Sequence, residues 1–363
     1  MLGEAHIAIR LLLTLAIGAA FAVLFKRLKV PAGYMVGAFV GVAILNCTTS
    51  GAWLPDNTRL AVQVVAGAFV GCSLERSDIR RLRYIGGPVA VMLGACLALM
   101  ILAGLCIFAL SPFDLVTSLM CAVPGGINDI PIVAADMGAD APVVAILQLV
   151  RQILGIAILP AIIAAFDRLR ENRGHPDTRS EDAIVGASGR VKSKQKSAAS
   201  TVAALAVALA GGLIGRATHI PGMTFCFVIV AVTVLKLGFD FAYIPKWLKK
   251  VIQVVAGCYI GTLLTLDGLL GMEALVVPVL IVVAFYTANC FATGWLEQRL
   301  FGYGRKEGML IASPAGASDM ILIMDDMGVK NTDVMIMQVI RASVVMAVFP
   351  QIVNLVCYVS QAI

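Results

Sequence analysis

The nine residues AVPGGINDI, from Ala122 to Ile130, interrupt an apolar segment with one proline and two glycines and then add a carboxylate, Asp129. A related stretch, ASPAGASDM, runs from Ala312 to Met320 and repeats the proline, the second glycine and the aspartate, with Asp319 in the place of Asp129. Backbone freed by such a break is tolerated inside a membrane only where it is buried in protein or lines a polar cavity. We therefore expect the two breaks to form a site.

The sequence around these breaks has the composition of a membrane protein. Hydrophobic residues make up 60% of the 363 residues and charged residues 14%, whereas a soluble domain has about 25% charged residues. Many apolar runs are long enough to cross the hydrocarbon core as a helix, for which about 20 residues suffice. The predicted fold class is an all-α polytopic membrane protein. The first apolar run lacks the features of a cleaved signal peptide, so we expect it to be retained as a span.

The apolar runs return in the same order at one constant spacing, which is the separation in sequence of Asp129 and Asp319. The run QVVAG at Gln63 to Gly67 recurs at Gln253 to Gly257. Further pairs keep the same spacing: Pro31 and Pro221, Gln148 and Gln338, Arg151 and Arg341, and Pro160 and Pro350. Duplicated halves are the usual construction of secondary transporters. We predict membrane repeat 1 at 1–166, a cytoplasmic polar linker at 167–199 and membrane repeat 2 at 200–363.

The loop charges indicate that the two repeats are inverted in the membrane. In repeat 1 the third loop carries four arginines between Arg76 and Arg83, whereas the equivalent loop of repeat 2 has no Lys or Arg. The second loop shows the opposite pattern, with four lysines between Lys236 and Lys250 in repeat 2 and only Arg59 in repeat 1. Basic loops face the cytoplasm, so each half must cross the membrane an odd number of times.

This odd number predicts how each broken stretch runs. The short runs 115–123 and 127–136, like 308–314 and 317–328, must enter and leave on one side as a re-entrant helical hairpin. We expect five transmembrane helices and one hairpin per half, with the hairpins entering from opposite faces. The protein is then a multi-pass protein of the bacterial inner membrane, with both termini outside and the linker in the cytoplasm.

Each break places an acidic residue at the start of the second hairpin arm. Asp129 follows Asn128, and Asp319 follows Ser318. Asn and Ser are favourable N-caps, and a carboxylate in the first turn complements the N–H groups there, which is a purely structural role. The alternative is that these carboxylates bind Na⁺ or H⁺ or pair with a basic residue at a substrate site, since ionisable groups inside a membrane default to function.

Two arginines lie deep inside long apolar runs. Arg151 and Arg341 are too far from a membrane surface to snorkel, and Gln148 and Gln338 precede them by three residues, on the same helix face. A midplane cavity lined by these groups suits a small anion, because guanidinium groups and helix N-termini both favour carboxylate or phosphate. The alternative is that the arginines only form structural salt bridges with the aspartates of the breaks.

The predicted substrate or ion site combines the two breaks with the two arginine helices: Pro124, Gly125, Gly126, Asn128, Asp129, Gln148, Arg151, Pro314, Gly316, Ser318, Asp319, Gln338 and Arg341. Gln63 and Gln253 either reach the same cavity or satisfy backbone groups. Asp136 and Asp326 are expected to cap the next turn. The G-x-x-x-G pairs are expected in helix packing: Gly37 and Gly41, Gly67 and Gly71, and Gly257 and Gly261.

Other classes of function have little support. The nine cysteines include no C-x-x-C and the three histidines are scattered, so no metal site or other cofactor is expected. No catalytic set or phosphate loop is present, and we do not expect an enzyme. The net charge of +6 comes from short loops, so no nucleic-acid partner is expected.

Each of the two inverted halves carries the same pattern, P-[GA]-G-x-[NS]-D, then D-M-G, then Q-x-x-R. In this the chain resembles the AbrB family of bacterial inner-membrane proteins, which is distinct from the DNA-binding regulator of similar name. The resemblance covers nearly the whole chain except the linker. Members carry labels such as ammonia monooxygenase or regulator of another gene's expression, yet this sequence has neither metal ligands nor a DNA-binding module. The architecture is also similar to cation-coupled anion transporters with two re-entrant hairpins.

The leading hypothesis is a secondary transporter of a small, anionic solute by alternating access, coupled to H⁺ or Na⁺. Its partners would be the lipid bilayer, the solute and a coupling cation, and a homodimer stays open. The rival hypothesis is a membrane sensor or regulator that influences gene expression through a partner, with the linker as its output. A membrane oxidoreductase is a distant third.

Overall fold

In the computed structural model, the described residues are 2–28, 30, 32–160, 162, 198–239, 242–266, 268, 271–315, 320, 323–324, 329 and 331–362. These residues contain helices and no strand, in agreement with the predicted all-α class. Five described helices are long and apolar enough to span a membrane: Ile7–Arg27, Arg76–Leu110, Ala199–Ala217, Glu273–Phe301 and Thr332–Ser360. Shorter apolar helices accompany them: Gly33–Thr49, Ala141–Ile156 and Met223–Phe239.

The helix order is similar in the two halves of the chain. The helices before the linker are α1 (Leu2–Arg27), α2 (Gly33–Thr49), α3 (Asn57–Gly71), α4 (Arg76–Leu110), α5 (Leu115–Ala122), α6 (Ile130–Asp136) and α7 (Ala141–Ile153), which continues into the π-helical turn η1 (Leu154–Ile158). Those after it are α9 (Ala198–Ala217), α10 (Met223–Phe239), α11 (Lys246–Leu263), the 3₁₀ turn η2 (Gly271–Leu275), α13 (Val276–Phe301), α14 (Arg305–Ala312) and α16 (Thr332–Ala362). Helix α10 begins and ends at the repeat equivalents of the first and last residues of α2, and α14 stands in the same relation to α5.

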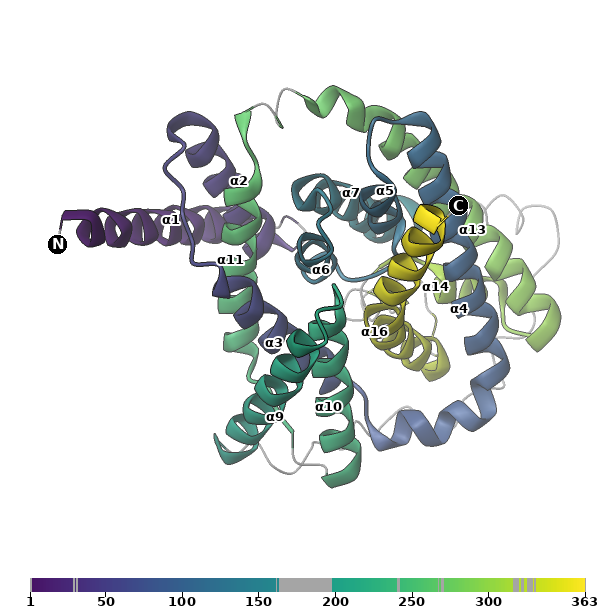
Figure 1. The fold of residues 1–363 in the computed structure, drawn as a ribbon. Coiled ribbons are helices and arrows are strands. Elements are labelled where there is room, and N and C mark those ends of the chain that lie inside the picture. The colour runs from purple at the N-terminus through teal and green to yellow at the C-terminus, as the bar shows by residue number, and fades with distance from the viewer. Residues whose placement is uncertain are drawn as a thin grey trace.

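The helices form two groups, each with contributions from both halves (Figure 1). The support group consists of α1, α2, α3, α9, α10 and α11. The hairpin group consists of α4, α5, α6, α7, α13, α14 and α16, and it holds most of the largest hydrophobic cluster. Helix α6 contacts α3 and α11, so the first break lies where the two groups meet.

Glycines let the helices of the two halves interlock in the support group. A Cβ atom on Gly71 of α3 would lie 2.9 Å from the carbonyl oxygen of Ile229 in α10. A Cβ atom on Gly261 of α11 would lie 2.9 Å from the carbonyl oxygen of Phe39 in α2. Gly67 and Gly257, one turn earlier, pack against the same two helices. The G-x-x-x-G pairs therefore serve close helix packing, as predicted.

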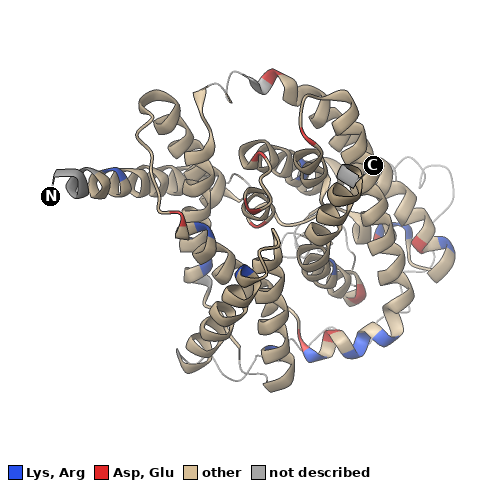
Figure 2. Ribbon diagram, in the orientation of Figure 1, with Lys and Arg blue, Asp and Glu red and all other residues tan. Residues whose placement is uncertain are grey.

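The stretch Arg76 to Arg83, expected to be a loop, forms the first turns of α4, where its basic residues follow one another along the helix (Figure 2). The reason is a capping box between Glu75 and Asp78, in which the Glu75 backbone N–H donates to Asp78 Oδ2 at 2.9 Å. Most of the predicted linker lies outside the described residues, and so do Pro31, Gly316, Ser318, Asp319 and Asp326.

Candidate functional site

Both breaks begin where a short helix stops. Helix α5 ends at Ala122 and α6 begins at Ile130, whereas α14 ends at Ala312 and is followed by Ser313, Pro314 and Ala315. The last carbonyl groups of such a helix have no partner within the helix. In a buried site they need donors from elsewhere in the protein.

In the first half, Gln148 and Arg151 of α7 supply these donors. Gln148 Nε2 donates to the carbonyl oxygens of Met120 at 3.2 Å and Val123 at 3.0 Å. Arg151 Nη2 donates to the carbonyl oxygen of Gly125. A positive charge at the C-terminal end of α5 also complements the helix dipole. Gln148 and Arg151 therefore hold the chain where α5 ends.

In the second half, Gln338 and Arg341 of α16 repeat this arrangement. Gln338 Nε2 donates to the carbonyl oxygens of Leu310 at 2.7 Å and Ile311 at 2.9 Å. Arg341 donates from Nη1 to Ser313 O at 2.6 Å and from Nη2 to Ala315 O at 2.9 Å. The recurring Q-x-x-R motif is thus a clamp on the chain where the short helix α5 or α14 ends.

Both arginines are buried cations. Arg151 is 1% exposed and Arg341 4%, and neither forms an ion pair with any residue that the structure describes. The salt bridge between Arg151 and Asp129, considered as the alternative to anion binding, is not formed, and Arg151 donates to the Gly125 carbonyl oxygen. Nε of each arginine has no hydrogen-bond partner in the described part of the chain. Among the described residues neither positive charge has an anionic partner, while Asp319, considered as a partner of Arg341, lies outside them.

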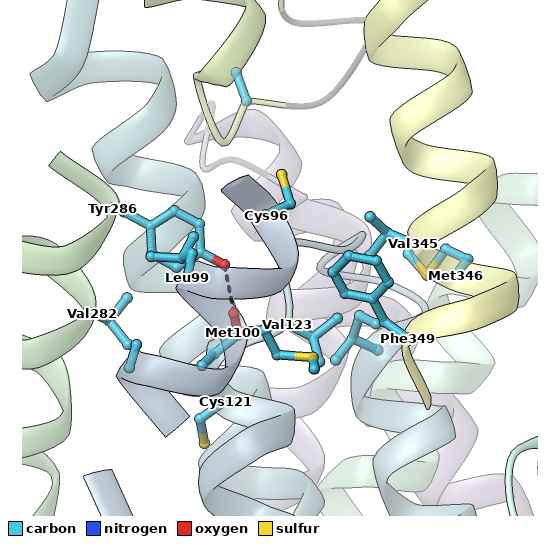
Figure 3. Packing of buried hydrophobic residues seen from close by; sticks show 14 of the residues in the cluster. Cys96, Leu99, Met100, Cys121, Val123, Val282, Tyr286, Val345, Met346 and Phe349 are labelled. Atoms are coloured by element: carbon cyan, nitrogen blue, oxygen red, sulfur yellow. Dashed lines mark hydrogen bonds between the residues drawn. The ribbon is translucent and has the colours of Figure 1, made fainter. Parts of the chain in front are cut away.

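Tyr286 of α13 is a polar residue of the site that sequence reasoning missed. Its hydroxyl donates to the carbonyl oxygen of Ala122 at 3.0 Å, shown as the dashed line in Figure 3, and its ring centroid lies 5.9 Å from Arg151 Cζ. The equivalent position in the first half is Cys96, so the internal repeat provides no signal for it. Tyr286 extends the clamp of the first break to a helix of the other half.

The tip of each break, which we define as Pro124 to Gly126 in the first half and as Pro314 and Ala315 in the second, packs against the last long helix of the opposite half. A Cβ atom on Gly126 would lie 2.7 Å from Met346 Cε in α16, and one on Gly155 in η1 would lie 2.7 Å from the backbone nitrogen of Ala315. The approach of Gly155 to the backbone of Ala315 requires glycine, whereas the flexible end of Met346 could move away from a larger residue at Gly126. Both contacts bring the two tips to the same region of the hairpin group.

A cavity of about 330 Å³ lies between the tips and the support-group helices α3 and α11. Eight residues weighed from the sequence line it: Pro124, Gly125, Gly126, Asn128, Asp129, Gln253, Pro314 and Arg341. Gln63, Gln148, Arg151 and Gln338 are not among the lining residues, and the last three support the tips from behind. Lys249 and Gln152 line the cavity and were missed.

The charged side chains among the described lining residues are Asp129, Lys249 and Arg341. Asp129 occupies the N-cap position of α6, yet its carboxylate accepts no capping hydrogen bond and forms no ion pair with any described residue. Lys249 Nζ lies 3.9 Å from the ring centroid of Phe69, at the wall formed by α3. The cavity thus carries two cationic groups and one carboxylate.

Asp136 has a different role from the expected cap. Its carboxylate pairs with Arg59 Nη2 of α3 at 3.1 Å and accepts a hydrogen bond from the Gly222 backbone N–H at 2.7 Å. Arg59 Nη1 also donates to Ala135 O at 3.1 Å. The cap of α7 is Asp140, which accepts from Val143 N at 3.1 Å. Asp136 was misassigned because it belongs to α6, so its carboxylate points to the support group.

Two comparisons bear on the identity of the chain. It matches the sequence profile of the AbrB family, described as "Transition state regulatory protein AbrB", over residues 2–167 and 52–357. It is also 24% identical over 352 residues to the uncharacterized protein YhjN of Bacillus subtilis (strain 168), a match that covers 93% of this chain and 90% of the relative.

Proposed function

The chain belongs to the AbrB family of membrane proteins, and from that premise we propose that it is a secondary transporter of a small anionic solute. It would work by alternating access in the bacterial inner membrane, with H⁺ or Na⁺ as the coupling cation. The observation that carries this proposal is the cavity at the two breaks, where Arg341 is buried without an ion pair in the described residues and Lys249 lies on the facing helix. Guanidinium and ammonium groups facing one cavity select for an anion.

The predicted inverted repeat with two re-entrant hairpins is the construction that this function would need. The recurrence of helix bounds at the repeat spacing favours a duplication, and residues 52–167 fall within both matches to the family, which is typical of an internally repeated chain. The alternation of basic loops favours opposite orientations of the halves. Transporters of this construction bind their solutes at the midplane, between broken helices.

The same orientation predicts that the cavity faces the cytoplasm in this structure. Ala32, Ser73 and Lys249 line it, and all three lie next to loops that the charge pattern places on the cytoplasmic side. On the other side, the contacts of Asp136 with Arg59 and Gly222 join the hairpin group to the support group. We therefore assign the structure to an inward-facing state with a closed extracytoplasmic side.

A thermal-shift screen with the purified protein in detergent tests the proposal. The probes are acetate, pyruvate, succinate, malate, citrate, inorganic phosphate and sulfate. At least one probe should raise the unfolding temperature, and Arg341→Gln should abolish that shift because it removes the cation at the cavity. The matched control is Arg299→Gln, an exposed arginine outside the cavity, which should retain the shift.

The decisive measurement is uptake of the stabilising probe into proteoliposomes. Uptake that is absent for the wild type, or a shift that survives in Arg341→Gln, would overturn the proposal.

The family description as a regulatory protein favours one other function, a membrane sensor that binds a solute and signals through the segment at 167–199. Replacing that segment by a flexible Gly/Ser linker of the same length separates the two. A transporter should keep its uptake rate, whereas a sensor should bind the solute as before and lose its output.

A further inference from the structure

Glu297 of α13 is a buried carboxylate that the proposed cavity does not use. It is 0% exposed, and neither carboxylate oxygen has a hydrogen-bond partner among the described residues. It forms no ion pair with any residue in the described part of the chain. It lies in Glu273–Phe301, one of the helices long and apolar enough to span a membrane.

Packing does not require a carboxylate at this position. The equivalent residue in the first half is Ile107, which is also 0% exposed. Three residues before them, Gly104 packs against Leu119 of α5 and Gly294 packs against Met309 of α14, with built Cβ atoms 2.9 Å from Leu119 Cα and from Met309 N. Residues three apart share a helix face. Glu297 therefore sits on the face of α13 that packs against the first hairpin arm, where the first half has an aliphatic side chain.

The charged groups of the elements packed around α13 do not pair with Glu297. Arg81 of α4 is paired with Asp333 of α16 at 2.7 Å, and Glu307 of α14 accepts from the Gly304 N–H at 2.9 Å. Arg151 of α7 is bonded to Gly125. Other ionisable groups on the elements around α13 include Arg80 and Arg83 of α4, Arg299 of α13 itself, Glu273 in η2, Tyr303 in the turn after α13, and Arg305 and Lys306 at the start of α14, and none of them is hydrogen-bonded to Glu297.

A buried carboxylate without a hydrogen bond or counter-ion is strongly disfavoured in its ionised form. It is stable when it carries a proton, because the neutral acid has a far smaller desolvation penalty. Glu297 is only one helical turn from the end of α13 at Phe301. A small displacement of α14 would bring water to the carboxyl group and allow the proton to leave.

We propose that Glu297 is a proton-binding site of the hairpin group, separate from the cavity, which takes up one proton as α14 closes over it and releases it when α14 moves away. The step is the reversible association of one H⁺ with one carboxylate, and no other bond changes. This role rests on the proposed transport function, for which it identifies H⁺ as the coupling cation.

Infrared difference spectroscopy of the purified protein tests the site with the proton alone as the probe. The wild-type minus Glu297→Gln spectrum at neutral pH should show the carbonyl band of a protonated carboxylic acid, which shifts in D₂O. The band should give way to carboxylate bands at alkaline pH. The control is Glu273→Gln, which alters an exposed carboxylate near the other end of the same span. The wild-type minus Glu273→Gln spectrum should show carboxylate bands at neutral pH.

Thermal unfolding gives a second readout. Ionisation of Glu297 at alkaline pH should lower the unfolding temperature of the wild type and of Glu273→Gln, and this loss should be absent in Glu297→Gln. If Glu297→Gln does not fold, Glu297→Ile, which introduces the residue of the first half, takes its place. Carboxylate bands from Glu297 at neutral pH would overturn the proton site, even if anions still bind the cavity. If Glu297 is protonated at neutral pH but the protein takes up no anion, the transport function is refuted and the proton site stands.

Discussion

Arg59 and Lys249 occupy equivalent positions in α3 and α11 of the two halves, yet Lys249 lines the cavity and Arg59 does not. Arg59 is held by Asp136 in an ion pair of 3.1 Å, which ties α3 to the end of the first hairpin. Lys249 lines the cavity that also contains Asp129. One half therefore has its cation in a contact between the two helix groups, and the other half has its cation at the cavity. Alternating access requires this kind of asymmetry, with one side closed while the other is open.

The clamps at the two breaks do not share this asymmetry. Gln148 and Gln338 bind equivalent carbonyl groups at Met120 and Leu310, and the arginine of each clamp binds the residue after the proline. These shared contacts fix the chain after α5 to α7 and the chain after α14 to α16, and Arg341 adds one further hydrogen bond, to Ser313. We infer that transport moves the hairpin group against the support group, with a smaller local displacement of α14 against α13.

The largest expected effect comes from reversing the charge at the closed side. Arg59→Glu places a carboxylate beside Asp136, and juxtaposed like charges cost several kcal/mol. The closed side should open and the cavity should close to the cytoplasm. In a cysteine-free background, a cysteine in place of Ser73, which lines the cavity, should react at least about tenfold more slowly with a cytoplasmic thiol reagent, since about 1.4 kcal/mol suffices for that change.

The charge swap Arg59→Glu with Asp136→Arg is the matched control, because it restores an ion pair with the opposite polarity. It should recover most of the labelling rate. Unchanged labelling of Ser73→Cys in the single Arg59→Glu variant would show that the Arg59–Asp136 contact does not close that side.

The second prediction compares the two clamps. Arg341→Met leaves the carbonyl groups of Ser313 and Ala315 without donors, whereas Arg151→Met leaves only that of Gly125. Each buried carbonyl group left unsatisfied costs about 1–3 kcal/mol. The relief from removing a buried charge is common to both variants, so Arg341→Met should be the less stable by about 1–3 kcal/mol. Unfolding in detergent measures the difference, and equal stability would contradict the two-donor clamp.

The clamps also show which parts of the site could be predicted from sequence. The spacing of Gln148 and Arg151, and its repetition, predicted that the two side chains share a helix face and act at one site. Their partners could not be predicted, because a backbone carbonyl carries no residue type. Arg151 was expected to bind an anion or to pair with Asp129, but the break in the helix leaves a closer acceptor at Gly125.

Lys249 was missed for a different reason. In sequence it is one of four lysines between Lys236 and Lys250 and reads as a loop charge that orients the helix. The structure places it within α11, whose first residue is Lys246, so that one helix face carries Lys249 and Gln253 into the cavity. The position of a helix start relative to a basic cluster decides which charges reach a site, and helix starts are poorly defined by composition.

The third prediction sharpens this distinction between neighbouring lysines. Lys249→Gln should weaken binding of the stabilising anion about tenfold, which corresponds to about 1.4 kcal/mol and is typical for loss of one charged contact. Lys250→Gln is the matched control, because Lys250 is outside the cavity lining and its Nζ lies 5.9 Å from the ring centroid of Tyr34. Isothermal titration with the anion compares the two, and equal losses of affinity would reduce the role of Lys249 to general surface charge.

The smallest expected effect is on stability, at a position outside the site where the two halves carry different residues. Gly94 in α4 is exposed and a Cβ atom there would meet nothing within 4 Å, while the equivalent residue in α13 is Ala284. Glycine in a helix interior is less favourable than alanine by about 0.5–1 kcal/mol. Gly94→Ala should therefore stabilise the protein by about that amount and leave anion binding unchanged. A destabilised Gly94→Ala in detergent would mean that the exposed face of α4 packs against something beyond this chain, and a second copy of the protein would then be the first partner to test by cross-linking.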